Sequence, residues 1–169
     1  MFNEVIGKLN ILQILRLAGS AMASFISLPD NPRPENKGAY LVLRQRASGL
    51  VLLANLIGDF SYSERALKCY GFAHEKGERL GNRPEDLSSW QSRNPDEEKW
   101  GGAVVAGNFL LSLSGLPELG DEAVMLVTAF LVGWSDETEI RQIATISSNP
   151  FLDPLFKKST ERWASRFAD

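Results

Sequence analysis

The side chains best suited to nucleophilic or metal chemistry are scarce in this sequence. It contains one histidine, His74, and one cysteine, Cys69. On a helix, this spacing would separate the two side chains by about 140° around the axis, so a direct Cys–His nucleophilic pair is not expected. A single cysteine also rules out an intrachain disulfide and a thiolate metal cluster. We therefore expect no tightly bound zinc.

Carboxylates are abundant, but they occur where helices are expected to begin. The acids at 96–98, 121–122 and 136–137 suit the positive end of a helix dipole, and we interpret them as structural caps. A buried member of such a pair could instead serve acid–base catalysis. The chain has no phosphate-binding glycine loop, no dinucleotide fingerprint, no H-E-x-x-H and no EF-hand loop. We predict no catalytic, cofactor-binding or metal-binding residue and no cofactor. Whether the protein is an enzyme stays open at this point, and the absence of these motifs favours a protein that is not one.

Five residues are candidates for partner contact or close packing. Trp90 lies in a polar stretch, where it either folds back and pins the loop or offers a partner an aromatic anchor. Gly102 and Ala106 lie four residues apart, as do Ala103 and Gly107, which on a helix makes one strip of small side chains. Glycine inside a helix costs about 1 kcal/mol relative to alanine. The strip therefore indicates close approach by another helix of the chain, with a subunit interface or a flat ligand as alternatives.

The elements that would position these residues are predicted to be helices. Apolar residues recur at three- and four-residue spacing, and prolines or glycines separate the periodic segments. No segment alternates with period two between hairpin turns, so no strand is expected. We predict an all-α fold, a compact bundle of about seven helices that forms a single domain over residues 1–169. The predicted helices cover residues 3–26, 39–57, 61–81, 94–114, 121–132, 136–148 and 153–167, with irregular stretches at 28–38 and 82–93. Ser48-Gly49 is expected to kink the second helix, Ser61 and Glu64 to form a capping box for the third, and Asn94-Pro95 to open the fourth.

A short motif, A-x-L-[I/V]-G, occurs at residues 54–58 and again at 129–133, each time with a glutamate ten residues after the alanine. We interpret it as a helical hairpin used twice, in which a glycine of positive φ ends one helix and a polar cap begins the next. Two such hairpins would form pseudo-symmetric halves of the bundle. Chance is the alternative, because helix ends favour glycine and helix starts favour serine and glutamate.

The first copy also resembles a known family. Gly58, Ser61 and Glu64 stand where the tellurite-resistance TerB-like family has its recurring A-D-G-x-[I/V]-S-x-x-E junction between helices. The resemblance covers residues 50–80, and 125–147 if the second copy is included, and it implies an all-helical fold. The acid that precedes the glycine in the family is replaced here by Ile57, and Asp59 follows instead. No ligand-binding role is therefore carried over to this chain.

Composition narrows the function further. Apolar residues make up 44% and charged residues 23%, as in ordinary globular proteins, and the net charge of −3 argues against nucleic-acid binding. The longest apolar runs are too short to span a bilayer, and the start, MFNEVIGKLN, does not resemble a signal peptide. We expect a soluble, cytoplasmic, bacterial scaffold that acts by protein binding or self-association. The alternatives are a small-molecule-binding regulator with an apolar pocket between the helices at 94–114 and 121–132, and a carboxylate- or metal-dependent enzyme.

Overall fold

The protein is a mixed α/β structure, and the predicted all-α bundle is wrong. The computed structural model describes residues 10–165, so the predicted helical positions before residue 10 and after residue 165 lie outside the described residues. The described residues form five α-helices and a four-stranded sheet. The helices are α2 (Ile11–Ile26), α3 (Ser63–Gly81), α4 (Glu118–Val132), α5 (Glu137–Ser147) and α6 (Leu152–Ala164). The strands are β1 (Gly38–Gln45), β2 (Val51–Gly58), β3 (Ala103–Ala106) and β4 (Phe109–Ser114), and two short 3-10 helices, η1 (Ser89–Ser92) and η2 (Pro95–Glu97), precede β3.

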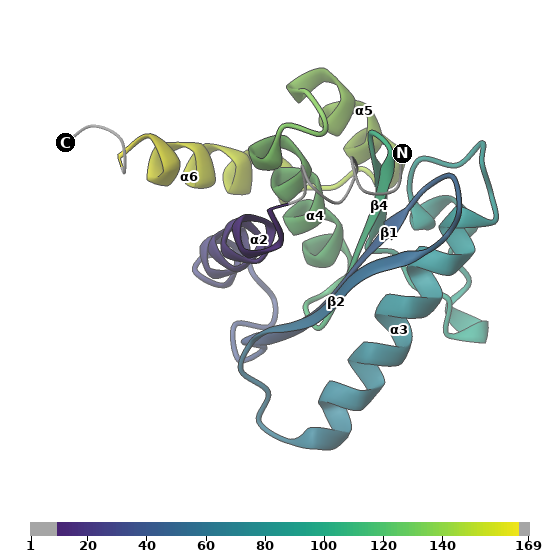
Figure 1. Ribbon diagram of the computed structural model, residues 1–169. Helices are drawn as coiled ribbons and strands as arrows, with labels where there is room; N and C mark the ends of the chain where they lie inside the picture. The colour runs from purple at the N-terminus through teal and green to yellow at the C-terminus, as the bar shows by residue number, and fades with distance from the viewer. Residues whose placement is uncertain (1–9, 166–169) are drawn as a thin grey trace.

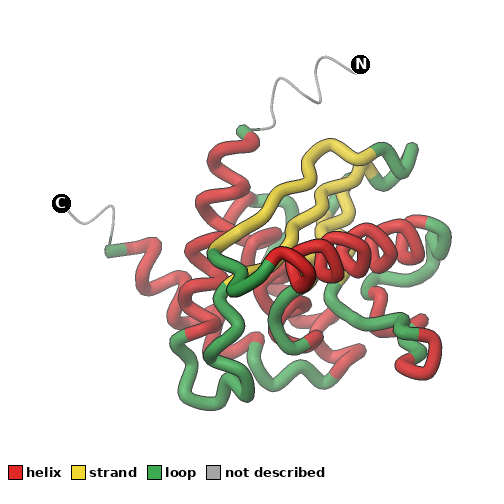
Figure 2. The backbone as a smooth tube through the Cα atoms, turned by 90° about the horizontal axis from the view of Figure 1, so that it is seen from below, coloured by secondary structure: helices red, strands yellow, loops and turns green. Residues whose placement is uncertain are grey.

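The sheet is antiparallel throughout, in the order β2-β1-β4-β3. It consists of two hairpins, β1–β2 and β3–β4, that join where β1 pairs with β4. Leu41 sits at the middle of this arrangement, opposite Asn55 on β2 and Leu113 on β4. α3 crosses one face of the sheet, while α2 and α4 cover the other (Figure 1). Seen from below, the long helix α3 lies in front of the strands (Figure 2).

The first hairpin occupies residues 38–58, where a helix was predicted. Strand β1, which is central in the sheet, is buried on both faces: Leu41, Val42 and Leu43 are all fully buried. A strand covered on both faces has a continuous apolar run and shows no alternation, so periodicity alone cannot separate it from a buried helix. The Ser48-Gly49 pair, which had suggested a helix kink, belongs to the turn between the strands, and Gly49 has a φ of +70°.

The second hairpin replaces the helix predicted at 94–114. Its two-residue turn is Gly107-Asn108, since Ala106 pairs with Phe109. Gly107 has a φ of +56°, which suits the first central position of a tight hairpin turn. Asn94 and Pro95 were expected to open this helix, but they introduce only η2, which ends at Glu98 in the left-handed region. The first of the two helices that were predicted to line an apolar pocket, at 94–114 and 121–132, is therefore absent.

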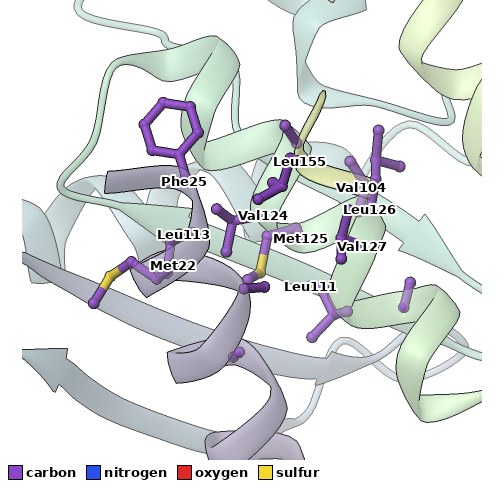
Figure 3. Packing of buried hydrophobic residues seen from close by; sticks show 14 of the residues in the cluster. Met22, Phe25, Val104, Leu111, Leu113, Val124, Met125, Leu126, Val127 and Leu155 are labelled. Atoms are coloured by element: carbon purple, nitrogen blue, oxygen red, sulfur yellow. The ribbon is translucent and has the colours of Figure 1, made fainter. Parts of the chain in front are cut away.

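The main core lies between the sheet and helices α2, α4 and α6. α4 is the central helix, and every residue from 120 to 129 is buried. Phe25 of α2, Leu113 of β4 and Met125 of α4 all contribute to this cluster, which Figure 3 shows from close by. The ring of Phe25 lies so near Gly120 that a Cβ there would come within 2.4 Å of it. This close approach fixes α2 against the start of α4.

The two copies of the repeated motif adopt different structures. Residues 54–58 belong to β2, and Gly58, with a φ of +70°, ends that strand. Gly133, with a φ of +82°, ends helix α4. The shared pattern therefore reflects only the preference of glycine for positive φ. The predicted repeat and its pseudo-symmetric halves are wrong.

Helix caps were predicted with mixed success. Asp136 caps α5 in a capping box with Glu139, as expected. The predicted box of Ser61 and Glu64 does not form, because α3 begins at Ser63 and Tyr62 is its cap residue. In the part of the chain that the structure describes, no helix is long and apolar enough to cross a membrane.

Candidate functional site

The two edges of the sheet differ in how far they are covered. The outer edge of β3 faces residues 87–89: the amide of Val105 donates to the carbonyl of Leu87 at 2.9 Å, and the amide of Ala103 donates to Oγ of Ser89 at 3.0 Å. At the other end of the sheet, no segment within residues 10–165 pairs with the outer edge of β2. The outward edge of β2 is therefore open to another strand.

The register shows which residues of β2 point outward. Residues that bond to a neighbouring strand alternate along an antiparallel pair. The amide of Asp59 donates to the carbonyl of Lys37 at 2.9 Å, which directs the odd-numbered residues at 53, 55 and 57 toward β1. The amide and carbonyl groups of Ala54 and Leu56 therefore point away from the sheet. Nδ2 of Asn55 reaches this edge and donates to the carbonyl of Leu56 at 2.9 Å.

The side chains of β2 are as suited to contact as its backbone. The strand reads VLLANLIG, with no charged residue and no proline, which are two of the devices that protect an edge strand. Its pairing with β1 shifts register between Leu43 and Arg44, which leaves the stretch from Leu53 to Gly58 regular. Val51 is 37% exposed and Leu56 is 40% exposed. Edge strands of this kind pair readily with another chain.

An exposed apolar area on α3 adjoins this strand. Leu67 is 72% exposed and Tyr70 is 42% exposed. Tyr40 of β1 pairs with Leu56 on the sheet and makes an edge-to-face contact with Tyr70, at 5.0 Å between ring centroids. Tyr40, Leu67 and Tyr70 line a groove of about 530 Å³ between α3 and β1, together with Ser63, Glu64 and Ala66. We call the combined area, comprising Val51, Ala54, Leu56, Leu67 and Tyr70, the β2 edge surface.

None of the five predicted contact residues lies on the β2 edge surface. Trp90 is half-buried in η1, where its ring covers Gly101 and lies under the guanidinium of Arg93 at 4.9 Å. Ala103 and Ala106 are buried in β3. The helical strip that was to include Gly102, Ala103, Ala106 and Gly107 is wrong, because these residues belong to a strand and its turns.

Close approach does occur at one end of the predicted strip. Gly102 has a φ of +115°, and a Cβ there would lie 2.8 Å from Cβ of Asp121 and 2.9 Å from Nζ of Lys76. Gly107 is an exposed turn residue, and a Cβ there would lie 3.0 Å from the carbonyl oxygen of Trp134. A larger side chain is thus excluded at Gly102 by two charged residues of α3 and α4.

Those two charged residues form a buried ion pair. Nζ of Lys76 lies 3.0 Å from Oδ2 of Asp121, and each side chain is only 2% exposed. Lys76 also donates to the carbonyl of Leu113 at 2.9 Å, and Oδ1 of Asp121 accepts from the amide of Leu116. Burial raises the pKa of Asp121 to about 6, against the opposing effect of Lys76. The pair joins α3, β4 and α4.

Glu122, the neighbouring acid, is fully buried on another side of α4. It accepts hydrogen bonds from the hydroxyls of Ser88 and Ser147 and from the amide of Asn149. Burial raises its pKa, while these bonds act in the opposite direction. Both carboxylates are therefore held by structural partners. Among the described residues, no group of three or more His, Cys, Asp or Glu side chains could hold a metal ion.

Cys69 and His74 also lie in separate surroundings. Burial, followed by the charge of Asp121, raises the pKa of the Cys69 thiol, which disfavours the reactive thiolate. Nδ1 of His74 lies 3.3 Å from a guanidinium nitrogen of Arg44. Burial and that cation lower the pKa of His74. The two side chains make no nucleophile–base arrangement.

Sequence reasoning missed Lys76 and the β2 edge surface. Lys76 carried a usable signal: Cys69, Ala73 and Leu80 lie at helical spacing on one face of α3, and Lys76 interrupts that apolar face. A lysine in such a position requires a buried acceptor. The edge surface carried no such signal, because β2 was assigned to a helix.

Comparison with known proteins identifies no relative: no family model, no curated protein and no solved structure matches this chain. The residues that resemble the TerB-like family lie at the end of β2 and the start of α3. A junction between two helices, which that family pattern describes, is absent at this position, and the all-helical fold that the resemblance implied is wrong.

Proposed function

We propose that the protein acts by protein–protein association through the β2 edge surface, and that its partner is a second copy of itself. Two β2 strands would pair antiparallel across a two-fold axis and extend each four-stranded sheet into a continuous one. The observation that carries this proposal is an eight-residue edge strand without charge or proline whose outward edge pairs with no other strand within residues 10–165.

The edge is self-complementary. If Ala54 of one copy lies opposite Leu56 of the second, both positions are of the hydrogen-bonded type and each pair exchanges two N–H···O bonds. The Leu56 carbonyl retains a second lone pair for this bond beside the one that Asn55 uses. Since β2 carries no charge, the two strands approach without electrostatic repulsion. Symmetric two-fold pairing is also the commonest form of association among soluble oligomers.

The association would also cover the apolar side chains beside the strand. Leu67 and Tyr70 lie next to the sheet, so a second copy that extends the sheet buries part of their exposed surface. Scaffolding in a reducing, cytoplasmic compartment, with Cys69 as the sole cysteine, remains part of the proposal. Catalysis has less support, because Asp121 and Glu122 are both engaged by structural partners.

Light scattering coupled to size-exclusion chromatography tests the proposal. The wild-type mass should double as concentration rises, while Ala54→Pro and Leu56→Lys should stay monomeric. Ala54 can accept proline because its amide points outward and bonds to no other strand within residues 10–165. Ile146→Lys is the matched control, since it places the same charge at an exposed apolar residue on α5 and should associate like the wild type. A wild type that stays monomeric, or variants that all associate equally, would contradict the proposal.

A further inference from the structure

A second hollow lies on the α3 side of the sheet, away from the β2 edge surface. It has a volume of about 490 Å³ and separates α3 from the connection between β4 and α4. Its lining includes Cys69, Ser114 and the Lys76–Asp121 pair, all of them buried. Phe72 of α3 and Trp100 contribute flat apolar surface. The volume is within the usual range for small-molecule sites, about 300–1,000 Å³.

The charges around this cleft do not balance. Lys76 is neutralised by Asp121 at 3.0 Å. Glu118 is held by a bidentate contact from Arg93, with its closest approach at 2.6 Å. Lys68 and Glu98 are 3.9 Å apart and both are about two-thirds exposed, so that pair is weak.

Two arginines remain without a carboxylate. Within the described residues, neither Arg33 nor Arg65 takes part in an ion pair, and both line the cleft. Arg65 is held in place, because its Nη2 donates to the carbonyl of Gly115 at 2.6 Å and its guanidinium lies over the ring of Phe60. A guanidinium held by one bond keeps further N–H donors for a ligand.

The start of α4 adds to the positive side of the cleft. Pro117 and Glu118 line it, and the helix that begins there runs for fifteen residues. Within residues 10–165 no side chain caps this helix start, and the two acids of its first turn, Glu118 and Asp121, are engaged by Arg93 and Lys76. A helix N-terminus carries partial positive charge from its amides, so it supports an anion bound between α3 and α4.

We propose that this cleft binds a small organic monoanion, a carboxylate joined to a flat apolar body. The carboxylate is placed against Arg33 and Arg65, and the flat body lies against Phe72 and Trp100. Glu98, which is only weakly paired with Lys68, lines the same cleft, and its negative charge disfavours a dianion such as phosphate more than a monoanion. The proposal does not depend on self-association, since the two surfaces have no residue in common.

Calorimetric titration with naphthylacetate tests this site, with naphthylacetamide as the uncharged match and inorganic phosphate as the dianion. We expect saturable binding of naphthylacetate that is about tenfold or more tighter than binding of either comparison compound. Arg65→Gln and Arg33→Gln should each weaken it by a similar factor. Arg16→Gln, at an exposed position on α2 across the sheet, is the matched control and should bind like the wild type.

Arg65→Gln loses the hydrogen bond to Gly115 and could unfold for that reason. Arg33→Gln does not have this drawback, because the side chain of Arg33 has no hydrogen bond or ion pair within the described residues. The second variant therefore keeps the test decisive. The proposal is overturned if naphthylacetate shows no saturable binding, if the acid and the amide bind equally, or if phosphate binds more tightly than naphthylacetate. It is also overturned if both cleft variants bind like Arg16→Gln.

Discussion

Replacing Lys76 with methionine should destabilise the fold more than most single substitutions. The change removes a cation whose Nζ lies 3.0 Å from Oδ2 of Asp121, where both side chains are 2% exposed. At that distance the attraction is about 5.5 kcal/mol for an effective dielectric constant of about 20. Loss of one partner from a buried pair leaves the other charge uncompensated, so we expect Lys76→Met to lower the free energy of unfolding by about 3–5 kcal/mol at neutral pH.

A double variant distinguishes the effect of one unpaired buried charge from the effect of losing both charges. Lys76→Met with Asp121→Asn removes both charges, and the amide oxygen of asparagine can still accept from the backbone of Leu116. Buried pairs replaced by neutral groups are often close to neutral in stability. We therefore expect the double variant to lie within about 2 kcal/mol of the wild type, well above Lys76→Met.

The loss of stability caused by Lys76→Met should also depend on pH. Between the ordinary Asp pKa of 3.8 and its folded value of about 6, the folded chain holds the Asp121 proton more tightly than the unfolded chain does. Acidification through this window therefore stabilises the fold. From pH 7 to pH 5 the wild type gains about one pKa unit of this effect, or 1.4 kcal/mol. Lys76 lowers the pKa of Asp121, so without it the folded carboxyl takes up its proton at a higher pH, and the variant gains more stability than the wild type over the same interval.

Urea unfolding followed by tryptophan fluorescence measures these differences. The loss of stability caused by Lys76→Met should be smaller at pH 5 than at pH 7. Effects of other titrating groups are common to both proteins and cancel in the comparison. A penalty below about 1 kcal/mol at pH 7, or one that does not change with pH, would refute the reasoning.

Three further substitutions follow from the same contacts, each measured as a shift in the urea midpoint. Gly102→Ala should lower the free energy of unfolding by about 2–4 kcal/mol, because its φ of +115° and the 2.8 Å approach to Asp121 exclude a Cβ. An unchanged midpoint would mean that the backbone relaxes freely. Glu122→Gln should cost about 1–3 kcal/mol, since its amide would meet the donors Ser88 and Ser147, and no loss would show that water satisfies them. Gly107→Leu should cost about 1–2 kcal/mol through turn strain at a φ of +56°. Gly107→Leu should not overpack a helix face, so a loss as large as that of a core substitution would contradict the turn assignment.

The sequence predicted the helices whose apolar faces are one-sided. α3 buries Cys69, Ala73 and Leu80 and exposes the opposite face, so its periodicity is visible. α5 was found with its cap, Asp136, for the same reason. In these segments the chain meets the core on one side only, and the pattern carries the information.

The two hairpins were lost because their strands are apolar on both faces. β1 and β4 are covered by α3 on one side and by α2 and α4 on the other, so alternation disappears. Their leucine-rich composition also favours helix over strand by propensity. The remaining signals were turn residues, Ser48-Gly49 and Gly107-Asn108, each lying between two apolar runs. Assigned to helices, those glycines suggested a kink and a packing strip.

The candidate sites were missed where they depend on the strands that the sequence did not reveal. Trp90 and the small residues at 102–107 were singled out for their types, but the structure places them in packing and turns. The β2 edge surface depends on which strand lies outermost, and strand order is set by tertiary pairing that a single sequence does not display. The buried Lys76–Asp121 pair joins residues far apart in the chain, so only Lys76 could have drawn attention.

Amide hydrogen exchange at the β2 edge, measured at low and high protein concentration, tests the proposed association most directly. The amides of Leu53 and Asn55 face β1 and should be protected at both concentrations. Those of Ala54 and Leu56 face outward, so they should exchange rapidly in dilute solution and become protected when a second copy pairs with the strand. Fast exchange at Ala54 and Leu56 at every concentration, with Leu53 still protected, would contradict the account.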